Sequence, residues 1–492
     1  MKKSSHPLLY QVNTRVWLNQ LSQEFGHPCT LDDLPDEWLE AIAQQGFDWI
    51  YFLGVWQTGA AGRIHSRTAP GMRQEFFTVL PDLENNDICG SCFAITRYSV
   101  AQNLGGNQAM QRLQERLHHF GMRLMLDFVP NHTATDHPWV ISHPEYYMHG
   151  TPADLKEQPD NFIALLTPAG EKILAHGRDP YFSGWVDTLQ LDYSQPIVQR
   201  IMQEELMNIA SLCDGVRCDM AMLVLPEIFL RTWGLSCAPF WPDTIQRVHQ
   251  AHPGFTLMAE VYWDMETTLL QQGFDFAYDK KLLDLLIHGQ GKEVVAHLEK
   301  TSPNQDRLAR FLENHDEKRA ASVFPLEVHQ AAAVITYLSP CLRFFHQGQL
   351  TGNRLRVPVH LCRGPQESPD ITLMEFYANL IECLSMPAIR MGSCQMLKPE
   401  ALGLSDNPGE SLLGFAWKAF GTNPVLVLVN YSGAATTARL DLDDFKLSGD
   451  RIRLLDQMSP MIIEIDPSKS NNQKHTLDMP AWSLHVFSLE VT

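Results

Sequence analysis

The sequence has no long hydrophobic run, no excess of basic residues and no tandem repeat. No stretch approaches the roughly twenty apolar residues that a membrane-spanning helix needs, which argues against a membrane protein of that kind. With 38 basic and 57 acidic residues, the net charge is −19. This charge argues against non-specific binding to nucleic acid or to an anionic membrane surface.

A signal segment and a disulfide pattern are also missing. The N-terminus carries two lysines but no apolar segment of signal-peptide length. The ten cysteines are irregularly spaced, and Cys89 and Cys92 form a C-x-x-C pair without the second pair of a zinc ribbon. We favour free buried thiols over a metal or redox role for this pair. Free thiols without a signal segment predict a cytoplasmic protein.

The first three quarters of the chain alternate short apolar runs with helical patterns. Met110, Leu113 and Leu117 keep helical spacing before Gly121, and Pro196 stands where a helix would begin. Such a rhythm predicts βα units around a parallel sheet. Eight units favour an α/β fold of the closed (β/α)8 TIM-barrel class. The predicted strands begin at or near Leu8, Phe47, Arg123, Gly215, Thr256, Phe274, Ala309 and Leu342.

Two regions break this rhythm. Residues 133–190 are long, polar and rich in His, Pro and Gly, which is typical of a lobe inserted near the active site of a barrel, here after strand three. After about residue 400, short apolar runs alternate with turn residues. We therefore expect a catalytic barrel over 1–132 and 191–400, an inserted lobe over 133–190, and a C-terminal antiparallel β-sandwich over 401–492.

Polar side chains gather where four of the predicted strands end. In a barrel these ends converge on one face, so residues that are distant in sequence would share one cleft. They are Asp127, Asn131 and His132 on or after strand three, Arg217 and Asp219 on strand four, Glu260 after strand five, and His315 and Asp316 after strand seven.

Glycoside hydrolysis needs a set of this kind. One carboxylate attacks the anomeric carbon, and a second, held protonated, donates to the leaving oxygen and later activates water. Their environments must push the two pKa values apart. Arg217 lies two residues from Asp219, on the same strand face, where it would keep that group ionised.

The segments DFVPNH, GVRCDMA, AEVYW and ENHD, in that order, resemble the four signature regions of the α-amylase family of glycoside hydrolases. The resemblance covers essentially the whole chain. It implies that Asp219 is the nucleophile, Glu260 the acid/base and Asp316 a third carboxylate that binds sugar hydroxyls. The remaining roles that it implies are an arginine that orients the nucleophile, two histidines of the sugar subsite and a structural carboxylate, at Arg217, His132, His315 and Asp127.

The sequence departs from the family pattern before strand three. Where many relatives have a Gly-Tyr step that stacks under the sugar, this chain reads Gly90-Ser-Cys-Phe93, so Phe93 is the candidate platform, or there is none. Trp263, three residues after Glu260, is a second candidate, although packing alone would explain it. The resemblance requires no cofactor. It leaves a structural calcium at Asn131 as an option, with no other ligand identified for the six to eight that calcium takes.

The favoured function is a retaining glycosidase that cleaves α-glucosidic bonds in soluble α-glucans or short α-glucosides through a covalent glycosyl-enzyme. The same carboxylates would serve a transglycosylase, a phosphorylase or an isomerase, and these remain alternatives. An inactive barrel that binds a sugar or a protein, and a metallohydrolase, are remoter ones. The expected partner is a carbohydrate, and the sequence predicts no oligomeric state.

Overall fold

A computed structural model describes residues 5–168, 170–402, 411–440, 442, 445, 451–465 and 475–491. Eight parallel strands form a closed barrel at its centre, in which β1 pairs with both β2 and β14. The prediction of a (β/α)8 barrel is confirmed. The strands are β1 (Leu8–Asn13), β2 (Trp49–Leu53), β5 (Arg123–Phe128), β10 (Gly215–Cys218), β11 (Thr256–Ala259), β12 (Phe276–Tyr278), β13 (Leu308–Arg310) and β14 (Leu342–His346).

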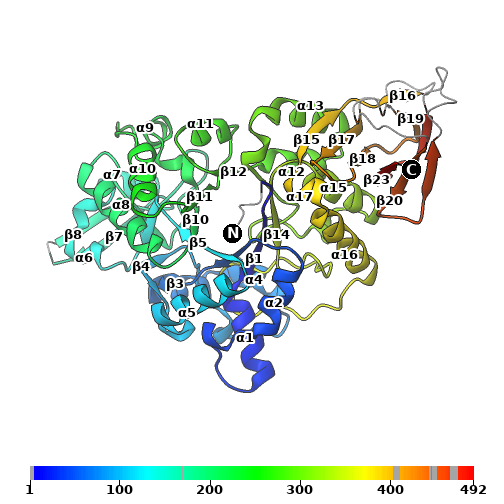
Figure 1. Cartoon of the computed structure of the whole chain (residues 1–492). Helices are drawn as coiled ribbons and strands as arrows, with labels where there is room; N and C mark the ends of the chain where they lie inside the picture. The colour runs from blue at the N-terminus through cyan, green and yellow to red at the C-terminus, as the bar shows by residue number, and fades with distance from the viewer. Residues whose placement is uncertain are drawn as a thin grey trace.

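Helices surround the barrel and cover the outer face of these strands (Figure 1). The strands are apolar and almost fully buried because they face the barrel interior on one side and the helices on the other. The longer helices are α1 (Thr14–Phe25), α2 (Asp36–Gln44), α5 (Gly106–His119), α8 (Pro196–Ala210), α9 (Pro226–Trp233), α10 (Trp241–Ala251), α12 (Lys280–Ile287), α13 (Gly291–Thr301), α15 (Leu326–Leu338) and α16 (Ile371–Ser385). The shorter ones are α11 (Glu266–Gln271), α14 (Ala320–Val323) and α17 (Pro387–Met391).

Local sequence explains where these helices start and stop. Helix α5 buries Met110, Leu113 and Leu117, the residues with helical spacing. Helix α8 begins at Pro196, whose fixed φ suits the first helical turn. Helix α1 ends at Gly26, which has a φ of 74°, a left-handed conformation that glycine adopts without strain.

Two excursions from the barrel rim flank β5. Between β2 and β5, the strands β3 (Trp56–Thr58) and β4 (Ile95–Val100) form an antiparallel pair, with α3 (Ala60–Thr68) and α4 (Pro70–Val79) between them. After β5 comes the lobe, which opens with β6 (His132–Ala134) paired antiparallel to β9 (Thr188–Gln190). Between them lie α6 (Trp139–Ser142), α7 (Pro152–Glu157), β7 (Phe162–Thr167) and β8 (Gly170–Ala175).

The C-terminal region forms two antiparallel sheets with a shared apolar core, as expected. One sheet contains β15 (Ser393–Leu397), β17 (Leu412–Lys418), β18 (Val425–Asn430), β23 (Leu484–Val491), β20 (Ile452–Asp456) and β21 (Ile462–Ile465), and the other β16 (Glu400–Leu402), β19 (Thr436–Leu440) and β22 (His475–Met479). The first strand begins at Ser393, ahead of the expected boundary at 401. The stretches 403–410, 446–450 and 466–474 of the predicted range, with 441, 443, 444 and 492, lie outside the described residues.

The C-terminal sheets pack against the barrel through buried aromatic residues. Trp417 of β17 is fully buried, and its indole N–H donates to the Leu338 carbonyl at the end of α15 over 2.8 Å. Its ring lies 5.7 Å from the Arg343 guanidinium of β14. Tyr431 likewise donates to the Leu286 carbonyl over 2.8 Å. These contacts join the two parts into one packed body.

None of the helices within the described residues has the length and apolar character to cross a lipid bilayer.

Truncating the buried indole of Trp417 should destabilise the whole chain, because this ring joins the C-terminal sheets to the barrel. We expect Trp417→Ala to lower the free energy of unfolding by about 3–5 kcal/mol, because it removes a filled core volume and leaves the Leu338 carbonyl without its donor. Phe420→Ala is the matched control, since Phe420 is fully exposed two residues after β17, and its effect should stay within about 0.5 kcal/mol. Urea unfolding measures both; equal effects would contradict the docking role of Trp417.

Candidate active site

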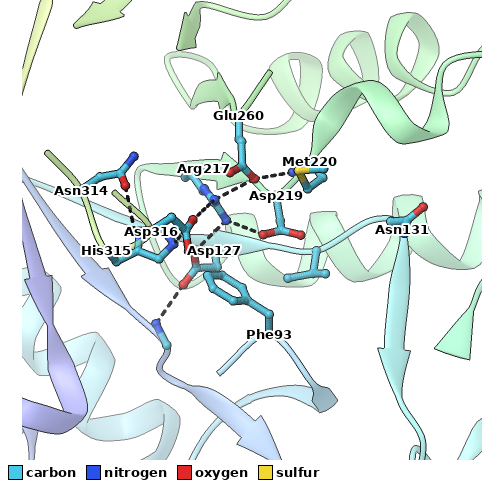
Figure 2. A network of polar contacts seen from close by, with 12 residues as sticks. Phe93, Asp127, Asn131, Arg217, Asp219, Met220, Glu260, Asn314, His315 and Asp316 are labelled. Carbon is cyan, nitrogen blue, oxygen red and sulfur yellow. Dashed lines mark hydrogen bonds and ion pairs between the residues drawn. The ribbon is translucent and has the colours of Figure 1, made fainter. Parts of the chain in front are cut away.

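One buried guanidinium lies among four carboxylates at the carboxyl end of the barrel (Figure 2). Arg217 of β10 has no exposed surface. Its Nη1 lies 2.6 Å from Asp219 Oδ1 and its Nη2 lies 2.7 Å from Glu260 Oε2. Asp127 and Asp316 are each 3.9 Å from a guanidinium nitrogen. The site therefore holds one cation for four potential anions.

The barrel ladder continues beyond the strand ends and positions the carboxylates. The Asp219 N–H donates to the Phe128 carbonyl over 2.8 Å, and the Glu260 N–H donates to the Cys218 carbonyl over 3.0 Å. Each carboxylate thus comes from the residue directly after a barrel strand, where the backbone is still held by its neighbour. This register brings Asp219 and Glu260 to the same guanidinium, although they lie 41 positions apart in sequence.

Asp127 is almost fully buried, and two hydrogen-bond donors hold its carboxylate. Its carboxylate accepts hydrogen bonds from the Tyr51 hydroxyl and, over 2.9 Å, from the Gly54 N–H. Burial raises the pKa of Asp127, and the Arg217 charge and the two donors oppose this. With both oxygens engaged, Asp127 lies beside the arginine at 3.9 Å, and the structural role expected of it stays a prediction.

Glu260 receives two further donors. The Met220 N–H donates to Oε2 over 2.6 Å and the Tyr262 hydroxyl donates to Oε1 over 2.9 Å. Burial nevertheless raises the pKa of Glu260 to about 7. The charge of Arg217 opposes this rise, and the negative charges of Asp219 and Asp316 add to it. A carboxyl with such a pKa holds a proton near neutrality and can also release it.

The other two carboxylates differ from Glu260 and from each other. Burial raises the pKa of Asp219, but the 2.6 Å contact with Arg217 opposes that effect. For Asp316, burial is outweighed by His315 and Arg217, which lower the pKa to about 2. The Asp316 side chain is 43% exposed, so an anion faces the open side of the site.

His315 connects Asp316 to the barrel floor. Its Nε2 lies 3.0 Å from Asp316 Oδ2, and its Nδ1 lies 2.9 Å from the Gln11 amide nitrogen of β1. An amide NH₂ only donates, so Nδ1 accepts and the ring proton sits on Nε2, facing Asp316. The half-buried Phe93 ring lies 5.4 Å from the His315 ring and 5.2 Å from the Arg217 guanidinium carbon. Phe93 therefore belongs to the wall of the site.

His132 and Trp263 lie at the margins of this centre. The His132 ring is buried, hydrogen-bonds the Phe93 backbone and lies 5.3 Å from the Trp185 ring; burial lowers its pKa to about 3, so it is neutral. Trp263 is 36% exposed, with a φ of 64°, and its ring contacts that of Tyr181 from the lobe at 5.0 Å. Neither ring has a described contact with Asp219, Glu260 or Asp316.

A cavity opens beside Glu260. It has a volume of about 430 Å³ and is lined by residues after β10 and β11, by the lobe and by α12. Tyr262 lines it and also bonds Glu260, so this space adjoins the acid/base carboxyl. The lining includes Met220, Tyr262, Trp263, Asp179, Phe182 and Lys280.

Sequence reasoning missed several residues of this site. Tyr262 was visible, because it lies two residues from Glu260 and so on the same side of an extended chain. Gln11 was also visible, as the polar residue in the first apolar run. Tyr181 carried no signal, because its contact with Trp263 depends on how the lobe folds back.

Comparison with known proteins places the chain in a family. The family model described as "Alpha amylase, catalytic domain" matches residues 93–354, more than half of the sequence. The chain belongs to the alpha-amylase family. The resemblance drawn from the four short motifs is thereby confirmed, and the matched range includes all four carboxylates.

Individual relatives of this family are distant. "Alpha-amylase MalA" of Haloarcula japonica is 23% identical over 351 residues, covering 70% of this chain and 48% of that protein. "Alpha-amylase 3" of Dictyoglomus thermophilum is 23% identical over 295 residues, covering 54% and 55%. The chain thus spans about half the length of the curated relatives it matches. The structure of a noncanonic maltogenic alpha-amylase AmyB from Thermotoga neapolitana superposes with a TM-score of 0.69 at 16% identity, covering 99% of both chains, which supports the fold.

The residues around Asn131 do not fit the calcium site that the family resemblance left open. The Asn131 amide oxygen accepts from the Gln190 side chain over 3.0 Å, and so does its backbone carbonyl. Within the described ranges, no three His, Cys, Asp or Glu side chains gather in a way that could hold a metal ion. Asn131 therefore joins the end of β5 to the lobe through Gln190.

Removing the central cation should destabilise the protein in a pH-dependent way. In Arg217→Met the buried carboxylates lose their counter-charge, so their folded-state pKa values rise above those of the unfolded chain. Stability is then lost as pH rises from the unfolded pKa of about 4 towards the raised folded values. We expect a loss of about 3–5 kcal/mol at pH 8 and a much smaller loss at pH 4.5.

Urea unfolding at the two pH values checks this. The control is Arg112→Met, because Arg112 pairs with Asp32 on the surface and should change stability little at either pH. A loss in Arg217→Met that is the same at both pH values would show that packing, rather than charge, accounts for it.

Proposed function

We propose that this alpha-amylase family member is a retaining glycosidase that cleaves α-glucosidic bonds in soluble α-glucans or short α-glucosides. The observation that carries the proposal is the shared guanidinium, since Arg217 contacts Asp219 and Glu260 at once, at 2.6 and 2.7 Å. Retention requires two carboxyl groups about 5–5.5 Å apart, and two groups on one guanidinium suit that separation.

In the first step, Asp219 attacks the anomeric carbon and Glu260 protonates the leaving oxygen. The charge of Arg217 favours the anionic form of Asp219, which is the nucleophilic one. With a pKa of about 7, about half of the Glu260 carboxyls carry a proton at pH 7, and more do at lower pH. The departing oxygen takes that proton, and a covalent bond links Asp219 to the sugar.

In the second step, Glu260 acts as the base. Its carboxylate, now stabilised by Arg217, Met220 and Tyr262, removes a proton from water, and the hydroxide oxygen attacks the anomeric carbon. Asp219 leaves as a carboxylate, and Glu260 has its proton back. Each residue ends in the state in which it began.

The sugar itself would be held by the exposed side of the site. Asp316, an anion by virtue of a pKa of about 2, accepts hydrogen bonds from sugar hydroxyls. The half-buried Phe93 ring offers an apolar face in the same wall. His315 directs its Nε2 proton toward Asp316 and keeps that carboxylate ionised and oriented.

Transfer to a sugar acceptor is a second candidate, favoured by the cavity beside Glu260. A leaving group or an acceptor could occupy its 430 Å³, with Trp263 as an aromatic surface. An acceptor retained there would compete with water for the glycosyl-enzyme. As to location, none of the ten cysteines, all within the described residues, is disulfide-bonded, and we propose the cytoplasm.

Covalent trapping tests the proposed nucleophile. Incubation with 5-fluoro-α-D-glucosyl fluoride should attach one glucosyl group, and peptide mass spectrometry should locate it on Asp219. Wild-type enzyme should convert maltooligosaccharides with retained α-configuration by NMR, and Glu260→Gln should lower kcat by about 10²–10⁴-fold. Asp243→Asn, on the exposed face of α10, is the matched control.

The products separate the remaining alternatives. Shorter sugars alone support hydrolysis, whereas longer or rearranged sugars without net hydrolysis support the transferase. An inverted product would contradict the proposed role of Asp219. No reaction with any α-glucoside, while the protein is folded, would favour a barrel that only binds sugar.

The pH dependence of kcat/KM should report Glu260. Because Glu260 must be protonated in the first step, activity should fall as pH rises through about 7. Tyr262→Phe removes a donor that favours the ionised carboxylate, so the alkaline limb should move up by about one unit. The control Tyr193→Phe loses a bond to the Pro130 carbonyl instead and should leave the limb in place. A downward shift for Tyr262→Phe would contradict the assignment.

A further inference from the structure

Away from the carboxylates, two distant chain segments run antiparallel beside the barrel. Ile88 and Leu361 form a β-bridge, flanked by hydrogen bonds of 2.8 Å from the Cys89 N–H to the His360 carbonyl and from the Cys362 N–H to the Asp87 carbonyl. One segment precedes β4 and the other follows β14. This register places Cys89 opposite His360 and Cys362 opposite Asp87, so the two cysteines are diagonal neighbours across the bridge.

The two thiols lie on the same side of this bridge. Side chains alternate along paired segments, so Ile88 and Leu361, which are fully buried, point one way and the flanking cysteines point the other. The Cys89 thiol donates to the His360 carbonyl over 3.3 Å, and the Cys362 thiol donates to the Asp87 carbonyl over 3.4 Å, so both thiols lie against the bridged backbone. Both residues are partly exposed, so small molecules in solution can reach them.

Arg15 gives this pair a positive neighbour. Its Nη1 donates to Cys89 Sγ over 3.4 Å, and its other acceptors are the Gly54 and Gly90 carbonyls and the Thr58 hydroxyl. In the part of the chain that the structure describes, no carboxylate pairs with Arg15. A thiolate at Cys89 would thus be its anionic partner.

The chemistry of the pair follows from these contacts. The Cys362 thiol, followed by the charge of Arg15, lowers the pKa of Cys89 despite its burial, while the Cys89 thiol raises the pKa of Cys362. Burial raises the pKa of Cys92 well above its ordinary value. Cys92 is also buried, whereas Cys362 is partly exposed and lies across the bridge from Cys89, so we take Cys362 and not Cys92 as the reactive partner.

We propose that Cys89 and Cys362 form a reversible disulfide by exchange with a small-molecule disulfide such as oxidised glutathione. The Cys89 thiolate attacks one sulfur of that molecule, breaks its S–S bond and releases one thiolate. Cys362 then loses its proton to solvent, attacks Cys89 Sγ in the mixed disulfide and releases the second thiolate. The two protein thiols are oxidised by two electrons, and the small disulfide is reduced to two thiols.

The proposed bond lies close to the active site along the chain. Cys89 is four residues before Phe93, whose ring lies 5.2 Å from the Arg217 guanidinium carbon. A disulfide would join the segment that carries Phe93 covalently to the loop after β14. It would also remove the thiolate that faces the buried Arg15. Oxidation of the two thiols would thus act on the segment that carries Phe93, and so on one wall of the carboxylate cleft.

Mass spectrometry of the intact full-length protein tests the proposal without any assay of glycosidase activity. In oxidised glutathione at pH 7, we expect the wild type to lose two hydrogens, with peptides containing Cys89 and Cys362 cross-linked, and dithiothreitol to reverse this. Cys362→Ser should stop at one glutathione on Cys89. A cross-link between Cys89 and Cys92, or first reaction at another cysteine, would overturn the assignment.

The rate of alkylation by iodoacetamide provides a second, independent readout. Cys89 should react at pH 7 at least about tenfold faster than Cys237, which is also partly exposed but has a pKa raised by burial to about 11. Other ionisable groups near Cys89 are Asp87, bound to Arg363 at 2.7 Å, and His360, whose pKa burial lowers to about 4. Arg67 donates to the Ile88 carbonyl, and His65 lies near His360. The comparison of Cys89 with Cys237 is therefore made at the single pH of 7. Equal rates at Cys89 and Cys237 would contradict a stabilised thiolate.

Discussion

The charge of Arg217 is the constraint on which the rest of the site depends. A carboxylate moved out of water into a protein interior loses several kilocalories per mole of solvation unless a cation compensates it. Here Asp127, Asp219 and Glu260 are nearly buried and share one guanidinium, with Asp316 at the edge. One cation cannot neutralise four anions, so at least one carboxyl must keep its proton. The geometry decides which one does.

That decision separates the roles of the carboxylates. His315 and Arg217 outweigh the burial of Asp316 and lower its pKa to about 2. Glu260 is buried near two other acids, so its pKa rises to about 7. A site with acids on both sides of neutrality is what double displacement on a sugar requires. Burial together with the neighbouring negative charges raises the pKa of Glu260, so an apolar pocket is not needed for that rise.

The barrel was predictable because each of its strands leaves a local signal. The run WIYFL of β2 is apolar throughout because both faces are buried, and the segment predicted at Arg123 begins where β5 begins. The three proposed catalytic carboxylates could be placed together because parallel strands in a barrel end on one face. What sequence periodicity could not supply were contacts set by folding of the connections. Cys362 meets Cys89 only because the loop after β14 returns beside the segment that precedes β4. The C-terminal sheets start at Ser393 because β15 pairs with β17, which comes later in the chain.

Backbone conformation completes the argument about Glu260. Four non-glycine residues in the described ranges have positive φ, and three of them, Met220, Trp263 and Asp264, follow the strands that end at Asp219 and Glu260. A left-handed conformation costs a non-glycine residue about 1–2 kcal/mol. Met220, with a φ of 42°, is also the residue whose N–H donates to Glu260 Oε2 over 2.6 Å. The strain is therefore located where it ties the two carboxylates together, so that a shift in one strand end is resisted by the other.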